Sequence, residues 1–301
     1  MRGLYRGYGL TFASDLTLPG FARAEPPADV TITLGTAARE TAEAMETPVN
    51  TMVPHPEGGH LLRVADAGDF WIRDEGTVLV TPADQAEEAY VRLYLTGSVM
   101  GLILHLRGIQ TLHAATVAIA GTAIAFVGEQ GAGKSTLAAT MAAAHPVLGD
   151  DVIALQTQGD QVLAHPGGAE FKLWQDTLDH LDWPRGSQIA NRTEKFFVPR
   201  GEVSTADPVR LGAVVVLERG GPQIAAARYT PLEATDLIVQ HGYRPEFVPS
   251  LGRQADHFRQ AAQLTARIPV WRLTRPEGLA QLAKTRSWLE DHWADLIARD
   301  D

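Results

Sequence analysis

An apolar run at residues 122–127 leads directly into a glycine-rich turn at residues 128–135, and good helix formers follow at 137–145. The turn reads Gly-Glu-Gln-Gly-Ala-Gly-Lys-Ser and fills every required position of the pattern G-x-x-x-x-G-K-[ST]. Its glycines let backbone N–H groups converge on phosphate oxygens, and the next helix directs its positive dipole end at the same anion. The pattern predicts a P-loop in an α/β fold; the alternative is a chance glycine-rich turn after a strand.

The predicted nucleotide site takes its residues from this turn and the start of the helix. Lys134 can reach the β- and γ-phosphates, and the Ser135 hydroxyl can ligate Mg²⁺. ATP and Mg²⁺ are the expected ligands. The predicted binding residues are Gly128, Glu129, Gln130, Gly131, Ala132, Gly133, Lys134, Ser135 and Thr136.

Two adjacent acids, Asp150 and Asp151, follow a short apolar run downstream of the turn. A nucleotide bound with Mg²⁺ needs a carboxylate near the metal, and a second carboxylate could accept the proton of an incoming hydroxyl. Neighbouring strand residues point to opposite faces, so a division of roles requires an irregular strand end here. The alternative is a solvated Asp-Asp turn.

Other candidates are single polar residues near the predicted strands. His113 precedes the strand pair that leads to the turn, where it could tune a catalytic carboxylate or be an ordinary core histidine. At least one cation besides Lys134 is expected, because charge spreads over several oxygens during phosphoryl transfer. The candidates for this charge-stabilising role, each also compatible with a solvated surface charge, are Lys195, Arg200 and Arg219.

The chain divides by pattern into two predicted domains. Residues 1–84 contain short alternating runs separated by Gly, Pro and Asp, which predicts a β-rich N-terminal module. Residues 85–301 begin with a buried helix over residues 87–106, closed by Gly108, and then alternate strands and helices. Residues 170–181 are predicted as a helix, and residues 276–293 as an amphipathic one.

Composition excludes several classes of function. Lys and Arg number 26 against 36 Asp and Glu, a net charge of −10, which argues against a nucleic-acid or anionic-membrane partner. The absence of cysteine excludes disulfides, thiolate zinc sites and a cysteine nucleophile. No signal peptide or membrane-spanning run is evident, so a cytoplasmic location is expected.

Residues 112–139, 147–155, 165–176 and 214–220 together resemble the HPr kinase/phosphorylase superfamily, and more specifically the HPr kinase-related proteins of lasso-peptide biosynthesis. The resemblance spans residues 85–285 and rests on a histidine, a P-loop and paired aspartates in that order. It implies a P-loop kinase core close to that of phosphoenolpyruvate carboxykinase. It also implies transfer of the γ-phosphoryl group of Mg-ATP to a serine hydroxyl, here the C-terminal serine of a lasso-type precursor peptide.

The resemblance further implies individual roles. Asp150 becomes the general base, Asp151 the Mg²⁺ partner of Ser135, and His113 the residue beside the base, so that His113, Lys134 and Asp150 form the catalytic set. Thr136 departs from the glutamate typical of HPr kinases, and the C-terminal signature tied to phosphorylase activity is not matched. The reverse reaction and HPr itself as substrate are therefore not expected.

Two other functions stay open at this point. One is a kinase of a small hydroxylated metabolite, since a fold does not fix its acceptor. The other is a nucleotide-hydrolysing switch or binding module that phosphorylates nothing. The oligomeric state and the preference between ATP and GTP are also left open; HPr kinases are hexamers, and no feature of the sequence dictates assembly.

Overall fold

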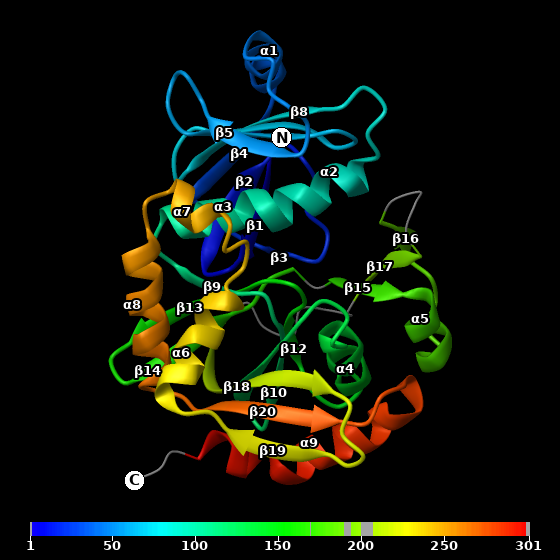
Figure 1. The fold of residues 1–301 in the computed structure, drawn as a ribbon. Helices are drawn as coiled ribbons and strands as arrows, with labels where there is room; N and C mark the ends of the chain where they lie inside the picture. Colours follow the sequence, from blue (N-terminus) through cyan, green and yellow to red (C-terminus); the bar gives the residue numbers. More distant parts are fainter. Residues whose placement is uncertain (1, 169, 190–193, 200–206, 299–301) are drawn as a thin grey trace.

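The computed structural model describes residues 2–168, 170–189, 194–199 and 207–298. The fold is mixed α/β. An N-terminal sheet lies at one end, a core sheet with helices on both faces forms the main body, and a small third sheet stands beside the core (Figure 1).

The N-terminal sheet has eight strands in the order β3-β1-β2-β4-β8-β7-β6-β5. The pairs β2/β4 and β4/β8 are parallel, and the others are antiparallel. Alternating apolar residues such as Phe12 and Ile32 are fully buried in it, as the period-two pattern predicts. The bounds are β1 Gly3–Gly7, β2 Leu10–Ser14, β3 Ala22–Arg23, β4 Val30–Leu34, β5 Thr51–Pro54, β6 His60–Val64, β7 Gly68–Ile72 and β8 Thr77–Pro82.

A long buried helix packs against one face of this sheet (Figure 1). It runs as α2 (Glu88–Tyr94), a π-helical turn η1 (Leu95–Val99) and α3 (Met100–Leu106), and Gly108 follows it with φ of 68°. The helix predicted over residues 87–106 is therefore confirmed. Its length and apolarity alone would allow a membrane span, but most of it is buried inside the fold, as in a core helix.

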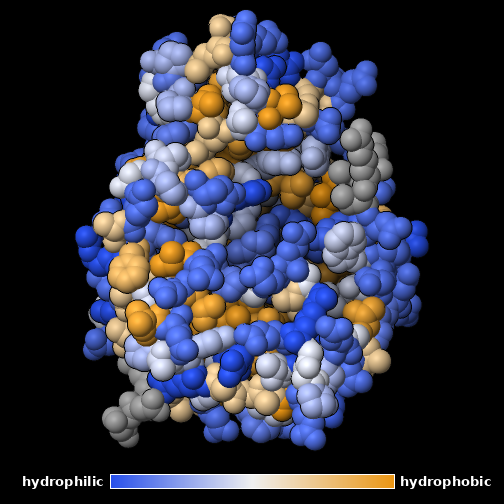
Figure 2. Space-filling view, viewed as in Figure 1, coloured by the Kyte–Doolittle hydropathy of each residue, from blue (hydrophilic) through white to orange (hydrophobic). Residues whose placement is uncertain are grey.

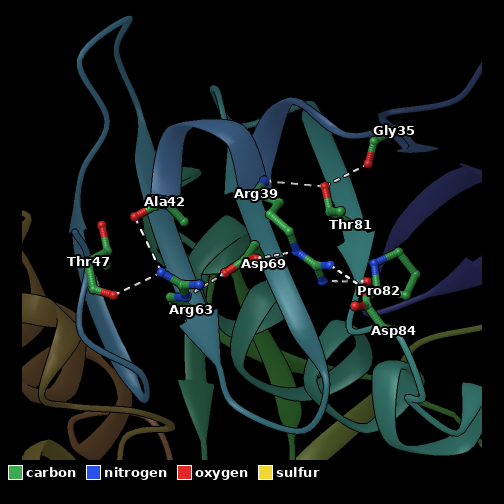
Figure 3. Close-up of polar contacts among 9 residues, drawn as sticks. All are labelled: Gly35, Arg39, Ala42, Thr47, Arg63, Asp69, Thr81, Pro82 and Asp84. Carbon is green, nitrogen blue, oxygen red and sulfur yellow. Dashed lines mark hydrogen bonds and ion pairs between the residues drawn. The ribbon is translucent and has the colours of Figure 1, made fainter. Parts of the chain in front are cut away.

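Helix α1 (Ala37–Ala44) covers the opposite face of the N-terminal sheet, and a buried ion-pair network holds it there (Figure 3). Asp69 is only 2% exposed and lies 3.2 Å from Arg39 Nε and 3.3 Å from Arg63 Nε. Arg39 also donates to the Pro82 carbonyl, and Arg63 donates to the carbonyl of Ala42. One carboxylate thus anchors arginines from the helix and the sheet.

The core sheet has nine strands. Its main path is β12-β10-β11-β18-β14-β13-β9, and β20 pairs with both β18 and β19. Only the centre is parallel, where β18 lies between β11 and β20. The bounds are β9 Gln110–Leu112, β10 Ala115–Ile119, β11 Thr122–Val127, β12 Val147–Gly149, β13 Ile153–Gln158, β14 Gln161–His165, β18 Val209–Arg219, β19 Ala225–Arg228 and β20 Val270–Arg275.

Helices cover both faces of the core sheet. On one face α4 (Lys134–Met141) and α9 (Leu282–Ile297) share an apolar cluster with the strands. On the other, α6 (Pro231–Gln240) and α8 (Gln254–Thr265) complete a second cluster. The short helices η2 (Leu279–Gln281) and α7 (Phe247–Ser250) precede α9 and α8 respectively.

The small sheet corrects one prediction. Residues 170–181 are not one helix: β15 (Glu170–Trp174) forms first, and α5 (Gln175–Leu181) follows. β15 pairs with β17 (Lys195–Pro199), which pairs with β16 (Ser187–Gln188). Phe171 and Leu173 alternate into the core as a strand requires, and this pairing with a distant segment outweighs local helix propensity.

We expect Asp69→Ala to lower the free energy of unfolding by about 3 kcal/mol, because it leaves two partly buried guanidinium groups without their counter-charge. Urea unfolding followed by circular dichroism measures this. Asp84→Ala is the matched control: Asp84 also pairs with Arg39, but its side chain is 90% exposed, so its loss should cost less than about 1 kcal/mol. Equal effects of the two substitutions would contradict the anchoring role of Asp69.

Candidate active site

The glycine-rich turn at residues 128–135 connects β11 to α4 at the carboxyl end of the strand. Gly128, Gly131 and Gly133 have φ values of 143°, 80° and 89°, where residues with a side chain are strained. A Cβ atom on Gly133 would also lie 2.5 Å from Nη2 of Arg275. The course of the turn thus depends on glycine for backbone conformation and for space.

Lys134 lies inside this turn. Its side chain is buried, and Nζ donates to the carbonyl of Gly128 at 2.8 Å and that of Glu129 at 3.4 Å. Burial lowers the pKa of Lys134, while the nearby carboxylates of Asp151 and Asp150 oppose that shift. The ammonium group therefore lies between the turn and the aspartates.

Asp150 and Asp151 occupy the bend between β12 and β13. Asp151 has φ of 86°, an uncommon conformation for a residue other than glycine. The irregular strand end that two roles would require is therefore present. Strained backbone of this kind persists only where the surrounding structure enforces it, and it is concentrated at functional sites.

Asp151 is held by two basic side chains. Its Oδ2 lies 2.7 Å from Nζ of Lys172, and its Oδ1 lies 3.3 Å from Nε2 of His113. Burial alone would raise the pKa of Asp151, but Lys172 and then His113 outweigh burial and bring it to about 2. The carboxylate is therefore fully ionised at neutral pH, and both of its oxygens are engaged.

Asp150 has different surroundings. Its Oδ2 accepts a hydrogen bond from the backbone N–H of Lys172 at 3.0 Å, whereas its buried Oδ1 has no hydrogen-bond partner among the described residues. Burial raises the pKa of Asp150, against the Lys172 N–H and the Ser135 hydroxyl, which lower it. An open carboxylate oxygen beside a serine hydroxyl is a donor set that suits Mg²⁺.

The structure corrects the expected neighbour of His113. The family resemblance placed His113 beside Asp150, but its ring contacts Asp151. The reason is local: the positive φ of Asp151 turns the chain between the two acids and gives them different neighbours. Partial burial lowers the pKa of His113, Asp151 opposes this, and Lys134 and Lys172 lower it further, so the imidazole is neutral at pH 7.

Two arginines end neighbouring parallel strands beside the turn. Arg219 of β18 and Arg275 of β20 are partners in the strand register. Nη2 of Arg275 donates to the carbonyl of Ala132 at 2.8 Å, and its Nε is buried without a hydrogen-bond partner among the described residues. Nη2 of Arg219 lies 3.1 Å from where a Cβ on Gly131 would be. Both cations therefore border the turn.

The other two predicted cations are Lys195 and Arg200, and only Lys195 lies among the described residues. Nζ of Lys195 lies 4.8 Å from the ring centre of Trp174 on the small sheet. Arg200 lies outside the described residues.

Most of the predicted site residues meet in one cavity of about 590 Å³, a volume typical of small-molecule sites. Three of the predicted binding residues do not line the cavity: Glu129 is exposed, and Gly128 and Ala132 are buried. The predicted residues that line the cavity are His113, Gln130, Gly131, Gly133, Lys134, Ser135, Thr136, Asp150, Asp151, Lys195 and Arg219.

The cavity also contains residues that sequence reasoning missed. Lys172 was missed because its segment was predicted as a helix, although the alternation around it is that of a strand. Arg275 ends an apolar strand just as Arg219 does, so the signal that identified Arg219 could have found it. Nothing in the sequence pattern distinguishes residues 241–244, which lie beside His113.

No described group of three or more acidic or histidine side chains is arranged to hold a metal ion. Mg²⁺ in nucleotide sites generally uses one or two protein ligands and completes its shell with phosphate oxygens and water. Ser135 and Asp150 fit that smaller requirement, and the turn with Lys134 fits a polyphosphate.

A scan against protein-family models and a search of curated proteins found no match. A search of solved structures matched the HPr(Ser) kinase/phosphatase from Coxiella burnetii at 12% sequence identity with a TM-score of 0.35. The match covers 62% of this chain and 92% of that one.

We expect Lys172→Gln to raise the pKa of Asp151 from about 2 by about one to two pH units, because the closest opposite charge is lost. Carboxyl-detected NMR titration measures this pKa. Lys195→Gln is the matched control, since Lys195 lines the same cavity but contacts Trp174, and it should leave the Asp151 value unchanged. An unchanged pKa in the Lys172 variant would show that the ion pair does not set the ionisation of Asp151.

Proposed function

We propose that this protein is a Mg-ATP-dependent kinase that transfers the γ-phosphoryl group to a serine hydroxyl. The observation that carries the proposal is the meeting, in one cavity, of the glycine-rich turn, Lys134 and two adjacent carboxylates with different surroundings. The resemblance in sequence motifs supports the same reaction and suggests the C-terminal serine of a lasso-type precursor peptide as acceptor.

The turn and Lys134 would bind the triphosphate. Backbone N–H groups of the turn would face the phosphate oxygens, and the Lys134 ammonium would exchange its carbonyl partners for phosphate. Ser135 and Asp150 would hold Mg²⁺, which supplies charge neutralisation on the phosphates when bound. We assign the metal to Asp150, because its buried Oδ1 has no hydrogen-bond partner among the described residues, whereas Asp151 already pairs with the Lys172 ammonium.

Asp151 would then act on the acceptor hydroxyl. Lys172 keeps it ionised, and His113, neutral at pH 7, lies 3.3 Å away and can take up the proton that Asp151 accepts. Phosphoryl transfer through a loose transition state places little demand on base strength. An ionised carboxylate with a low pKa can therefore orient the hydroxyl and receive its proton as the bond to phosphorus forms.

Arg219 and Arg275 would stabilise the charge that develops on the transferred group. They border the turn at the ends of β18 and β20. Because Arg275 is buried and already tied to the carbonyl of Ala132, it would chiefly position the turn. The exposed Arg219 is the better placed of the two to contact phosphate.

The two aspartates should respond differently to substitution. We expect Asp151→Asn to keep its affinity for Mg-ATP and to lose about 10²- to 10⁴-fold in the rate of transfer, because the proton acceptor is gone. We expect Asp150→Asn to weaken Mg²⁺-dependent nucleotide binding. Calorimetric titration with Mg-ATP and single-turnover transfer measure the two effects. The opposite result would restore the assignment of Asp150 as base.

The acceptor is tested with γ-labelled ATP. We expect label to appear on the serine of peptides that end in serine, and no transfer from Lys134→Ala, which loses the phosphate-binding ammonium. A panel of small hydroxylated metabolites is the comparison. Label only on a metabolite would assign a small-molecule kinase, and release of free phosphate alone would assign a nucleotide-hydrolysing switch.

A further inference from the structure

A second cavity, of about 560 Å³, lies where the N-terminal sheet, helix α2–η1 and the segment before α7 meet. Strands β5 and β6, helix α2, the π-helical turn η1 and helix α7 all contribute to its wall. Figure 2 shows the molecule hollowed between the N-terminal end and the core, with apolar side chains in the hollow. The residues that matter for the argument are Met52, Leu62, Tyr90, Tyr94, Arg244 and Phe247. We refer to it below as the Arg244 cavity.

Arg244 links this cavity to the catalytic aspartates. It lines the cavity, and its guanidinium carbon lies 5.8 Å from the ring centre of Tyr243, the neighbouring residue on the side of the site. The preceding residues border the site directly. The His113 N–H donates to the carbonyl of His241 at 2.8 Å, and the rings of His113 and Tyr243 are 5.9 Å apart.

The conformation of Arg244 is unusual for a surface arginine. Its φ is 50°, in the left-handed region that residues with a side chain seldom adopt. Its one ion pair within the described chain is with Glu246 at 3.3 Å, and the two side chains are 41% and 56% exposed. Such a solvent-screened pair contributes little, and the buried Nε of Arg244 has no hydrogen-bond partner among the described residues. The guanidinium therefore has donor capacity left for an anionic ligand.

The walls of the cavity suit part of an organic ligand. The Tyr90 and Tyr94 rings lie edge to face with centres 5.3 Å apart, and their hydroxyls are 3.4 Å apart. Met52, Leu62 and Phe247 add apolar surface. Aromatic and apolar walls with a few polar groups at one end are typical of ligand sites.

We propose that the Arg244 cavity binds the acceptor, and that Arg244 binds a carboxylate carried next to the acceptor hydroxyl. This rests on the proposed function, since it concerns the substrate of that reaction. Charge supplies the reason. The hydroxyl must approach Asp150, Asp151 and a polyphosphate, all negative, and Lys172 is already paired with Asp151, so a carboxylate beside the hydroxyl needs a further cation. A guanidinium matches a carboxylate with two parallel hydrogen bonds.

The rest of the cavity limits the acceptor further. Asp66 and Glu246 are its other charged lining residues within the described chain. They would disfavour a second acid in the acceptor. The expected acceptor therefore carries a single carboxylate near its hydroxyl and neutral, apolar groups beyond it. A peptide that ends in serine and a small hydroxy acid share the first feature, and the peptide alone would fill the apolar wall.

The test uses a pool of N-acetylated hexapeptides with neutral residues and a final serine, made with a free carboxylate or with a terminal amide. We expect the wild-type protein to phosphorylate the carboxylate pool about 10- to 100-fold more efficiently than the amide pool. Arg244→Gln should bring that ratio close to one without changing the affinity for Mg-ATP, and Arg244→Lys should restore part of it. Arg259→Gln, an exposed arginine on α8, is the matched control and should keep the wild-type ratio.

Binding without turnover separates this inference from the proposed function. The same pools are bound to the full chain with a non-hydrolysable ATP analogue, and free serine and a small hydroxy acid are run beside them. Transfer with no preference for the carboxylate, or a preference that survives Arg244→Gln, would overturn the inference and leave the kinase assignment intact. Arg244-dependent binding of the carboxylate pool without transfer would support the inference and contradict the kinase assignment. Binding of the small hydroxy acid alone would contradict the inference that the cavity accepts a peptide.

Discussion

The ion pair between Lys172 and Asp151 joins the small sheet to the core sheet at the site, beside the apolar cluster that Phe171 and Leu173 share with the core. Lys172 belongs to the small sheet, and Asp151 to the bend between two strands of the core sheet. The same residue also holds Asp150 through its backbone N–H. Two adjacent carboxylates at a partly buried position repel each other and lose solvation, so they need nearby cations and donors. Lys172 supplies one of each.

Around this pair, the residues with positive φ and the cationic side chains of the site belong to different elements. The positive φ values of three glycines and of Asp151 shape the turn and the bend. Lys134, Arg219 and Arg275 approach from the turn and from two parallel strand ends. Each cation therefore comes from a different element of the core.

The N-terminal sheet has two distinct relationships with the rest of the chain. Its own stability depends on the network at Asp69 and on apolar burial, in a cluster that extends to Val152, the residue after Asp151. Its β5 and β6 edge, however, forms a wall of the Arg244 cavity together with helix α2. An acceptor site at this junction would explain why a β-rich module accompanies the core sheet. It would also place specificity and chemistry on separate elements.

Local pattern in the sequence was enough to predict the glycine-rich turn, the buried helix near residues 87–106 and the strands that flank the aspartates. Each of these features depends on neighbours within a few residues, whose spacing or conformational preference is visible in the chain. The prediction of one helix over residues 170–181 was wrong, because the first part of this segment becomes a strand only by pairing with β17. The family resemblance placed His113 beside Asp150, whereas it contacts Asp151, since the direction of a side chain at a bend depends on backbone angles that spacing does not specify. Contacts across long separations, such as Arg275 with Ala132, 143 residues apart, arise only when the sheets assemble.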